Sequence, residues 1–177
     1  MGRGPRQITT EDELYAAAVG ALARRAYSVL EMRRYLDRRA GDGALAAPVL
    51  GRLRAEGLVD DARYARQFAR DRSANRRQGH FRIARELRAR GVADRYIEAA
   101  LDELEPETDE AAMIRRRIQS WLRRHSMADP SALDQRRTAS LYQSLLRAGF
   151  PGDRIRAELH RLGRSAESLP AQDPDEE

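Results

Sequence analysis

The sequence predicts an all-α protein of three tandem three-helix repeats, with about nine helices forming an elongated, curved array. Three observations support this prediction. The 177-residue chain is rich in alanine and arginine and has few aromatic residues, which favours helix over sheet. It contains no long β-branched runs of period two. Its apolar residues recur at helical spacing, and this spacing is repeated along the chain.

Residues 11–57 are predicted to form the first repeat. Its first helix begins at the acids of residues 11–13, where the positive end of a helix dipole favours negative charge. Ser28 and Glu31 have the spacing of a capping box, which predicts that a second helix starts there. A glycine-rich turn leads to the third helix, which Gly57 is suited to end in a left-handed conformation.

Residues 58–106 are predicted to form the second repeat. Asp60 or Asp61 caps its first helix, which has aromatic and alanine side chains on one arc and arginines on the opposite arc. The next helix covers about residues 80–90, and the last ends before Pro106. Tyr27, Tyr64, Phe68 and Tyr142 occupy apolar-face positions in their repeats, so we expect all four in the core.

Residues 107–163 are predicted to form the third repeat. Its first helix starts near Asp109 and carries Trp121 on its apolar stripe, where core packing is expected rather than base stacking. Outside the repeats, we expect a mobile Gly/Arg arm over residues 1–10 and a disordered acidic tail over residues 164–177.

A shift of 58 residues superimposes part of the second repeat on the third. The spacing from leucine to glycine to isoleucine to leucine is identical in the two segments. The matched pairs are Leu87 and Leu145, Gly91 and Gly149, Val92 and Phe150, Ile97 and Ile155, and Leu101 and Leu159. Units of this kind bury their apolar faces by stacking on one another, which generates an extended surface.

Several runs resemble the RecX family of RecA regulators. They are AYSVLEMRRYL, LRAEGLVDDARYARQFARDR, RIARELRARGV and LYQSLLRAGFPGDRI. The resemblance covers about residues 22–162, and its most specific part begins with the phrase Gly57-Leu58-Val59-Asp60-Asp61. His80 departs from the family, which often has proline after the glycine.

The resemblance implies a negative regulator of RecA. Proteins of this family look like crescents of three-helix repeats that lie in the groove of a RecA filament on DNA. They inhibit its ATPase, strand exchange and co-protease activity, and so modulate recombination, DNA repair and the SOS response. The resemblance therefore implies two partners, the RecA filament and DNA.

The charge pattern independently indicates an acidic partner. All 33 basic residues are arginine, and the net charge of +5 includes five acids in the last thirteen residues. Residues 61–90 hold ten arginines and three acids, so we expect a binding surface there rather than a merely solvated face. The candidate contacts to RecA or DNA are Arg63, Arg66, Arg70, Arg72, Arg76, Arg77, Arg82, Arg85, Arg115, Arg116 and Arg123.

The sequence carries no sign of catalysis. It has no cysteine, its three histidines are far apart, and no phosphate-binding or nucleophile motif occurs. We therefore expect no catalytic residue, no metal and no cofactor. No apolar run is long enough to span a membrane, so we expect a cytoplasmic protein. We also expect a monomer. Two alternatives remain open: a DNA-binding protein that acts without RecA, and a helical adaptor for another acidic protein.

Overall fold

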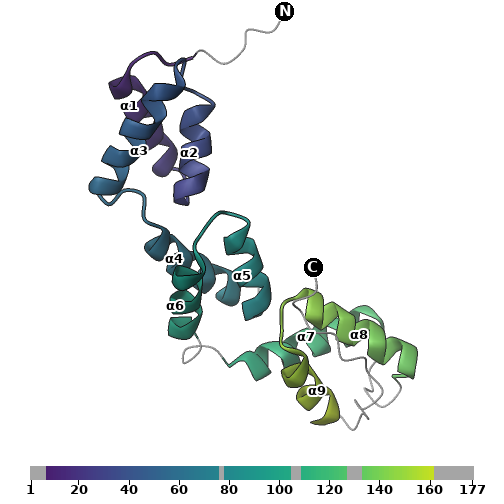
Figure 1. Cartoon of the computed structure of the whole chain (residues 1–177). Coiled ribbons are helices and arrows are strands. Elements are labelled where there is room, and N and C mark those ends of the chain that lie inside the picture. The colour runs from purple at the N-terminus through teal and green to yellow at the C-terminus, as the bar shows by residue number, and fades with distance from the viewer. Residues whose placement is uncertain (1–6, 76–77, 105–108, 127–132, 162–177) are drawn as a thin grey trace, which may run out of the picture. The chain divides into compact units, whose positions relative to one another are not determined.

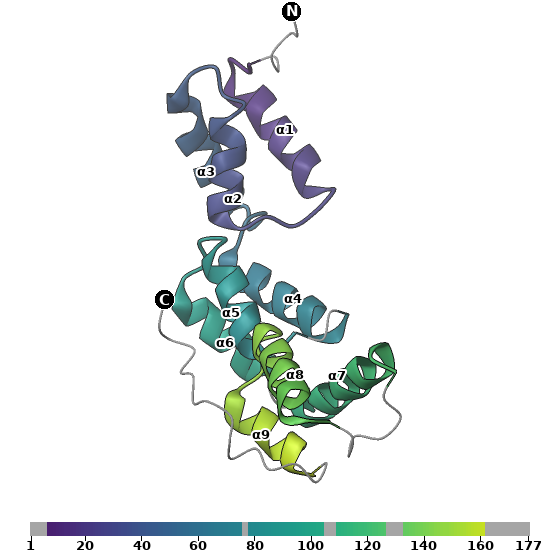
Figure 2. The same cartoon turned by 90° about the vertical axis from the view of Figure 1, so that its right-hand side faces the viewer.

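The structure, a computed structural model, describes residues 7–75, 78–104, 109–126 and 133–161 (Figures 1 and 2). These residues form nine α-helices, one short 3-10 helix and one isolated β-bridge, which confirms the all-α prediction. The helices are α1 Glu11–Leu22, α2 Val29–Asp37, η1 Gly43–Leu45, α3 Ala46–Ala55, α4 Asp61–Ala74, α5 His80–Arg88, α6 Asp94–Leu104, α7 Glu110–Arg124, α8 Gln135–Arg147 and α9 Gly152–Arg161.

Packing divides the chain into two compact units. Unit 1 consists of residues 1–69 and 86–101, and unit 2 consists of residues 70–85 and 102–177. The helices α4, α5 and α6 therefore contribute residues to both units. This division into two units differs from the predicted division into three sequence repeats. The predicted repeat boundaries remain a proposal.

The core of unit 1 lies between α1, α2 and α3, which pack pairwise (Figure 1). Leu14, Met32, Leu36 and Leu53 are fully buried there, each at a position that the helical spacing places on the apolar face. The Tyr35 hydroxyl is satisfied inside this core because it donates to the Ala17 carbonyl oxygen at 3.0 Å.

The predicted capping box of α2 is present in full. The Glu31 amide donates to the Ser28 hydroxyl at 3.1 Å, and the Ser28 amide donates to the Glu31 carboxylate at 3.2 Å. Before α1, Ile8 forms a parallel bridge with Ala40. Residues 1–6 of the arm expected over residues 1–10 lie outside the described part of the chain, and its mobility remains a prediction.

Unit 2 has its own core between α7, α8 and α9, which also pack pairwise. Trp121 is buried there, as predicted, and stacks on the His125 ring with centroids 3.9 Å apart. Asp109 and Asp134 cap α7 and α8 by accepting backbone N–H donors. The acidic tail expected over residues 164–177 lies outside the described residues.

The 58-residue repeat has a counterpart in backbone geometry. Gly91 and Gly149 both have positive φ, at 75° and 88°, and each ends a helix. The Val92 amide donates to the Leu87 carbonyl at 3.2 Å, and the equivalent bond from Phe150 to the Leu145 carbonyl measures 3.3 Å. Each is a hydrogen bond of the Schellman motif, which needs a residue that tolerates the left-handed region at the helix end.

Candidate partner-binding surface

The predicted arginines of α4 and α5 differ in how their guanidinium groups are used. Arg63 is exposed and donates to the Gly57 carbonyl oxygen, and Arg82 donates to the Arg147 carbonyl oxygen at 3.3 Å. Arg85 is exposed and has no polar partner among the described residues. Three others interact within the chain, namely Arg66, Arg70 and Arg72. Arg76 and Arg77 lie outside the described residues.

The predicted arginines of α7 divide in the same way. Arg115 forms ion pairs with Glu158 at 3.2 Å and Asp109 at 3.5 Å. Glu158 is only 3 % exposed, so the Arg115 guanidinium compensates a buried charge and supports the fold. Arg116 and Arg123 are exposed and pair with no described residue, so they are available to an acidic partner.

Further arginines whose guanidinium groups have no described hydrogen bond, ion pair or ring contact lie outside the set that the sequence analysis singled out. Arg34 and Arg38 occur one turn apart at α2 and its C-cap. Others in unit 1 are Arg24 and Arg54, and those in unit 2 are Arg136, Arg137, Arg147 and Arg154. Charge density alone could not find them, because only the folded contacts separate paired from unpaired guanidinium groups.

In unit 1 the start of α2 is joined to residues far along the chain. The Ser28 hydroxyl donates to the Arg90 carbonyl oxygen at 2.7 Å, and the Val29 amide donates to the Asp61 carboxylate at 2.9 Å. Leu30 packs so tightly on Gly91 that a Cβ there would lie 2.4 Å from a Leu30 methyl carbon. These contacts fix the α2 N-terminus on the end of α5 and the start of α4.

In unit 2 the start of α5 makes a similar junction. The Gly79 amide donates to the Ala148 carbonyl oxygen at 2.9 Å, and the Phe81 amide donates to the Gly149 carbonyl oxygen at 3.2 Å. A Cβ at Gly149 would lie 2.4 Å from the Cβ of Arg82. In both units, therefore, the N-terminus of one helix packs on the glycine that ends another, and each glycine is needed for this close approach.

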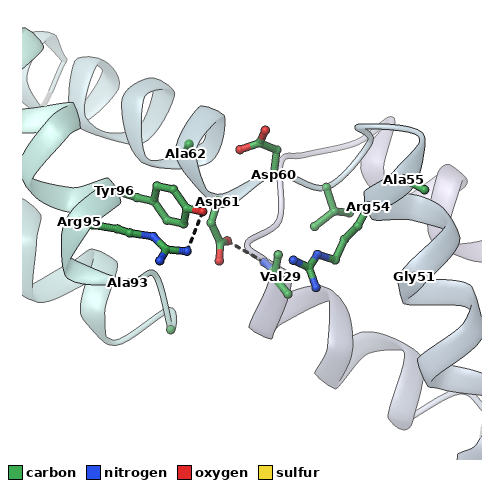
Figure 3. A pocket seen from close by; sticks show the side chains of 12 residues that line it. Val29, Gly51, Arg54, Ala55, Asp60, Asp61, Ala62, Ala93, Arg95 and Tyr96 are labelled. Atoms are coloured by element: carbon green, nitrogen blue, oxygen red, sulfur yellow. Dashed lines mark hydrogen bonds between the residues drawn. The ribbon is translucent and has the colours of Figure 1, made fainter.

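Unit 1 also contains an open pocket of about 650 Å³. Figure 3 shows the guanidinium groups of Arg54 and Arg95 on either side of the Asp61 carboxylate. Arg95 donates to the Tyr96 hydroxyl at 3.0 Å, and neither arginine forms an ion pair with a described carboxylate. Since Asp60 also lines the pocket, its two arginines and two aspartates balance, and it adds no net positive charge to the surface.

The two aspartates at the start of α4 have opposite pKa shifts. The hydrogen bond from the Arg63 amide lowers the pKa of Asp60, which is the N-cap. Burial raises the pKa of Asp61, despite the hydrogen bond from Val29 and the positive charge of Arg54. Burial, followed by the negative charge of Glu31, likewise raises the pKa of the Tyr64 hydroxyl. Asp61 and Tyr64 therefore serve the packing of unit 1.

One aromatic side chain that the sequence analysis did not single out is exposed. Phe81, on the first turn of α5, is 47 % exposed and lies beside Arg82.

Of the four aromatic residues predicted to lie in the core, Tyr64 and Tyr142 are buried, whereas Tyr27 and Phe68 are only partly buried. Tyr27 nevertheless packs against the core of unit 1, and Phe68 stacks on the Tyr64 ring with centroids 5.9 Å apart.

Among the described residues, no group of three or more His, Asp or Glu side chains could hold a metal ion. No described helix has the length and apolar character needed to cross a bilayer. In the described residues, the features best suited to bind a partner are the unpaired guanidinium groups and one exposed aromatic ring.

Comparison with known proteins assigns the chain to a family. Residues 60–101 match the family model described as RecX, second three-helix domain. The chain is 39 % identical over 142 residues to the regulatory protein RecX of Halorhodospira halophila, covering 80 % of this chain and 83 % of that protein. It is 38 % identical over 148 residues to the regulatory protein RecX of Pseudomonas putida strain GB-1, covering 84 % and 90 %.

Solved structures show the same fold. A crystal structure of RecX from Lactobacillus salivarius aligns with a TM-score of 0.71 at 21 % identity, covering 86 % of this chain and 96 % of that one. A second crystal structure, of a regulatory protein RecX, aligns with a TM-score of 0.73 at 21 % identity, covering 85 % and 71 %.

Proposed function

This chain belongs to the RecX family of regulatory proteins, and we propose that it is a negative regulator of RecA. It binds the RecA filament on DNA and inhibits the filament's ATPase, strand exchange and co-protease activity. It thereby limits recombination, DNA repair and the SOS response. It acts as a cytoplasmic monomer without catalysis or a cofactor.

The observation that carries this proposal is the similarity to RecX proteins over about four fifths of the chain, at 39 % identity to the Halorhodospira protein. The arginine surface is consistent with it, because a protein filament on DNA presents both carboxylates and phosphates. The planar guanidinium fork suits both groups. Contacts to phosphate would position the protein without reading sequence, and contacts to carboxylate would set its specificity for the filament.

Within the predicted contact set, the unpaired arginines are the first choice. Arg85, Arg116 and Arg123 can bind a partner without breaking a bond to a described residue. Those with partners in the fold, Arg63, Arg66, Arg70, Arg72 and Arg82, would have to exchange a partner or share it. Arg115 is assigned to the fold because it compensates Glu158.

The test is the ATPase rate of the cognate RecA on single-stranded DNA, with this protein added well below one molecule per RecA monomer. Strong inhibition at that ratio is expected, because one bound regulator on a filament affects many subunits. An unchanged rate even at equimolar protein would refute the proposal. A rate that falls only in proportion to DNA bound by the regulator would point to simple competition for DNA.

Matched variants test which arginines contribute. Replacing Arg85, Arg116 and Arg123 together by glutamine should raise the half-inhibitory concentration by about tenfold, or ~1.4 kcal/mol. The control is Arg88→Gln, because Arg88 is also exposed but pairs with Asp94 at 2.7 Å. Equal effects of the triple variant and the control would mean that unpaired arginines have no special part in binding. Circular dichroism checks that both variants keep their helicity.

A second candidate is DNA binding without RecA, which the spread of unpaired arginines over helices of both units favours. The measurement is affinity for naked duplex DNA against salt concentration. A protein that neutralises Z phosphates shows a slope of log K against log[salt] of about −0.9Z. Tight, steeply salt-dependent binding without any effect on RecA would favour this function. A pull-down that returns neither RecA nor nucleic acid would favour a helical adaptor instead.

A further inference from the structure

Phe81 is the most exposed of the large apolar side chains in the described residues, at 47 %. The other two are Leu58 at 40 % and Val19 at 38 %. Single exposed apolar residues are common on protein surfaces and need no special cause. Phe81 differs in its sequence neighbours, because Arg82 follows it and Arg85 comes one turn later on α5. An aromatic ring combined with arginines is typical of sites that bind single-stranded nucleic acid.

Two segments of unit 2 meet around Phe81. The bonds from Gly79 to Ala148 and from Phe81 to Gly149 join residues 78–85 to residues 144–151. The Arg82 guanidinium donates to the Arg147 carbonyl oxygen at 3.3 Å, which adds a third link. These two segments contain three arginines and no aspartate or glutamate, so every charged side chain within them is a cation.

The backbone that carries the ring is closely fitted. A Cβ at Gly79 would lie 2.1 Å from the Gly149 carbonyl oxygen, and a Cβ at Gly149 would lie 2.4 Å from the Arg82 amide nitrogen. Gly79 and Gly149 are therefore required as glycine for this approach. Because the backbone on either side of Phe81 is held in place, little of this protein's backbone entropy is lost when a partner binds there.

We propose that Phe81 stacks an unpaired base of single-stranded nucleic acid, while Arg85 and Arg147 bind the flanking phosphates. Both arginines are exposed and have no side-chain partner among the described residues. Aromatic rings stack on any base because every base has a π face, so the site selects strandedness rather than sequence. An apolar pocket of a protein could also receive Phe81, but it would not require that the charged residues of both segments be arginines.

This inference deepens the proposed function by assigning a single-strand contact to the regulator. The test uses no RecA, so its failure leaves the RecA proposal standing. The full-length chain is titrated into a fluorescein-labelled 15-nucleotide oligo(dT), and anisotropy gives the dissociation constant. A parallel titration uses a 15-nucleotide abasic strand, which has the same phosphates and no bases. The variants are Phe81→Ala, Phe81→Leu and Phe81→Tyr.

Stacking predicts that Phe81→Ala weakens binding to oligo(dT) by about fivefold to a hundredfold. Phe81→Leu should lose about as much, because it keeps apolar surface and has no π face. Phe81→Tyr should bind like the original protein. On the abasic strand all four proteins should bind alike. The matched control is Leu58→Ala, which removes an exposed apolar side chain of unit 1 and should change neither affinity.

Three results would overturn the inference. The first is no measurable binding of oligo(dT) by the original protein. The second is an equal loss on both strands for Phe81→Ala, which would mean a general effect on the surface or the fold. The third is full affinity in Phe81→Leu, which would identify an apolar contact of the kind a protein partner makes. Circular dichroism of each variant separates a lost contact from a lost fold.

Discussion

Ser28 and Arg90 are 62 residues apart in the chain, and the buried hydroxyl of the first donates to the backbone carbonyl of the second at 2.7 Å. The same hydroxyl accepts the Glu31 amide at 3.1 Å. One side chain thus caps α2 and ties that helix to the residue before the Gly91 turn. The capping box is a local pattern, and here it also carries a long-range contact.

Ser28→Ala should lower the free energy of unfolding by about 2 kcal/mol, because it removes a helix cap and leaves the Arg90 carbonyl without this donor. Urea unfolding followed by circular dichroism measures the change. The control is Thr10→Ala, because Thr10 caps α1 at 3.4 Å and has no described long-range side-chain bond. That variant should cost about 0.5–1 kcal/mol. Equal losses for the two variants would argue against the link to Arg90.

Gly79→Ala should destabilise the protein by about 2 kcal/mol or more, because its Cβ would lie 2.1 Å from the Gly149 carbonyl oxygen and the backbone would have to move. Gly51→Ala is the matched control. Gly51 lies inside α3 with open space at its Cβ position, so alanine should stabilise by about 0.5–1 kcal/mol. Opposite signs in urea unfolding are expected, and a tolerated Gly79→Ala would contradict the close approach.

Asp61→Asn should change the dependence of stability on pH. Burial raises the pKa of Asp61 in the folded protein, so the folded chain binds its proton more tightly than the unfolded chain does. Ionised Asp61 therefore lowers the free energy of unfolding. This loss of stability is fully present above the raised folded pKa and disappears below the unfolded pKa of about 3.9. The original protein should therefore gain stability relative to Asp61→Asn as the pH falls through that window. Urea unfolding at several pH values measures the difference.

The asparagine retains an oxygen that can accept the Val29 amide, so the comparison isolates the charge. Asp61→Ala also removes that acceptor, so it should be less stable than Asp61→Asn by about 1 kcal/mol at every pH. A stability difference between the original protein and Asp61→Asn that grows in the opposite direction, with rising pH, would show that ionised Asp61 stabilises the fold.

Arg115→Ala should lower the free energy of unfolding by about 2 kcal/mol, because it leaves the buried Glu158 carboxylate with Arg161 as its remaining described cation. Arg116→Ala, at the next position of the same helix, removes an unpaired exposed side chain and should change stability by less than about 0.5 kcal/mol. Thermal unfolding of both variants checks this contrast. Similar effects would mean that pairing does not distinguish the two arginines.

Sequence patterns predicted the features that depend on local chemistry. Helical spacing identified most of the buried positions, the Ser28–Glu31 pair identified a cap, and Gly57 identified a helix end. Each of these patterns lies within a few residues of the backbone it controls. The same reasoning placed Trp121 in the core, where the structure has it.

The contacts that join distant segments could not be predicted in this way. Arg115 and Glu158 are 43 residues apart, and no local pattern distinguishes a structural arginine from a binding one. The exposure of Phe81 depends on how the start of α5 meets Gly149, which spacing within one helix does not specify. The sequence therefore predicts that the candidate surface has an excess of positive charge. It does not predict which individual side chains are free to contact a partner.

The sharing of α4, α5 and α6 between the two units has a consequence for synthesis. Residues 86–101 are made after residues 70–85, so unit 1 stays incomplete until the ribosome has passed the first segment of unit 2. At about 5–20 residues per second, that delay after Ala69 is about 2–6 s. For the same reason no single cut in the polypeptide can release either whole unit without residues of the other, and a fragment ending near Ala69 would lack the Arg90 and Gly91 partners of α2.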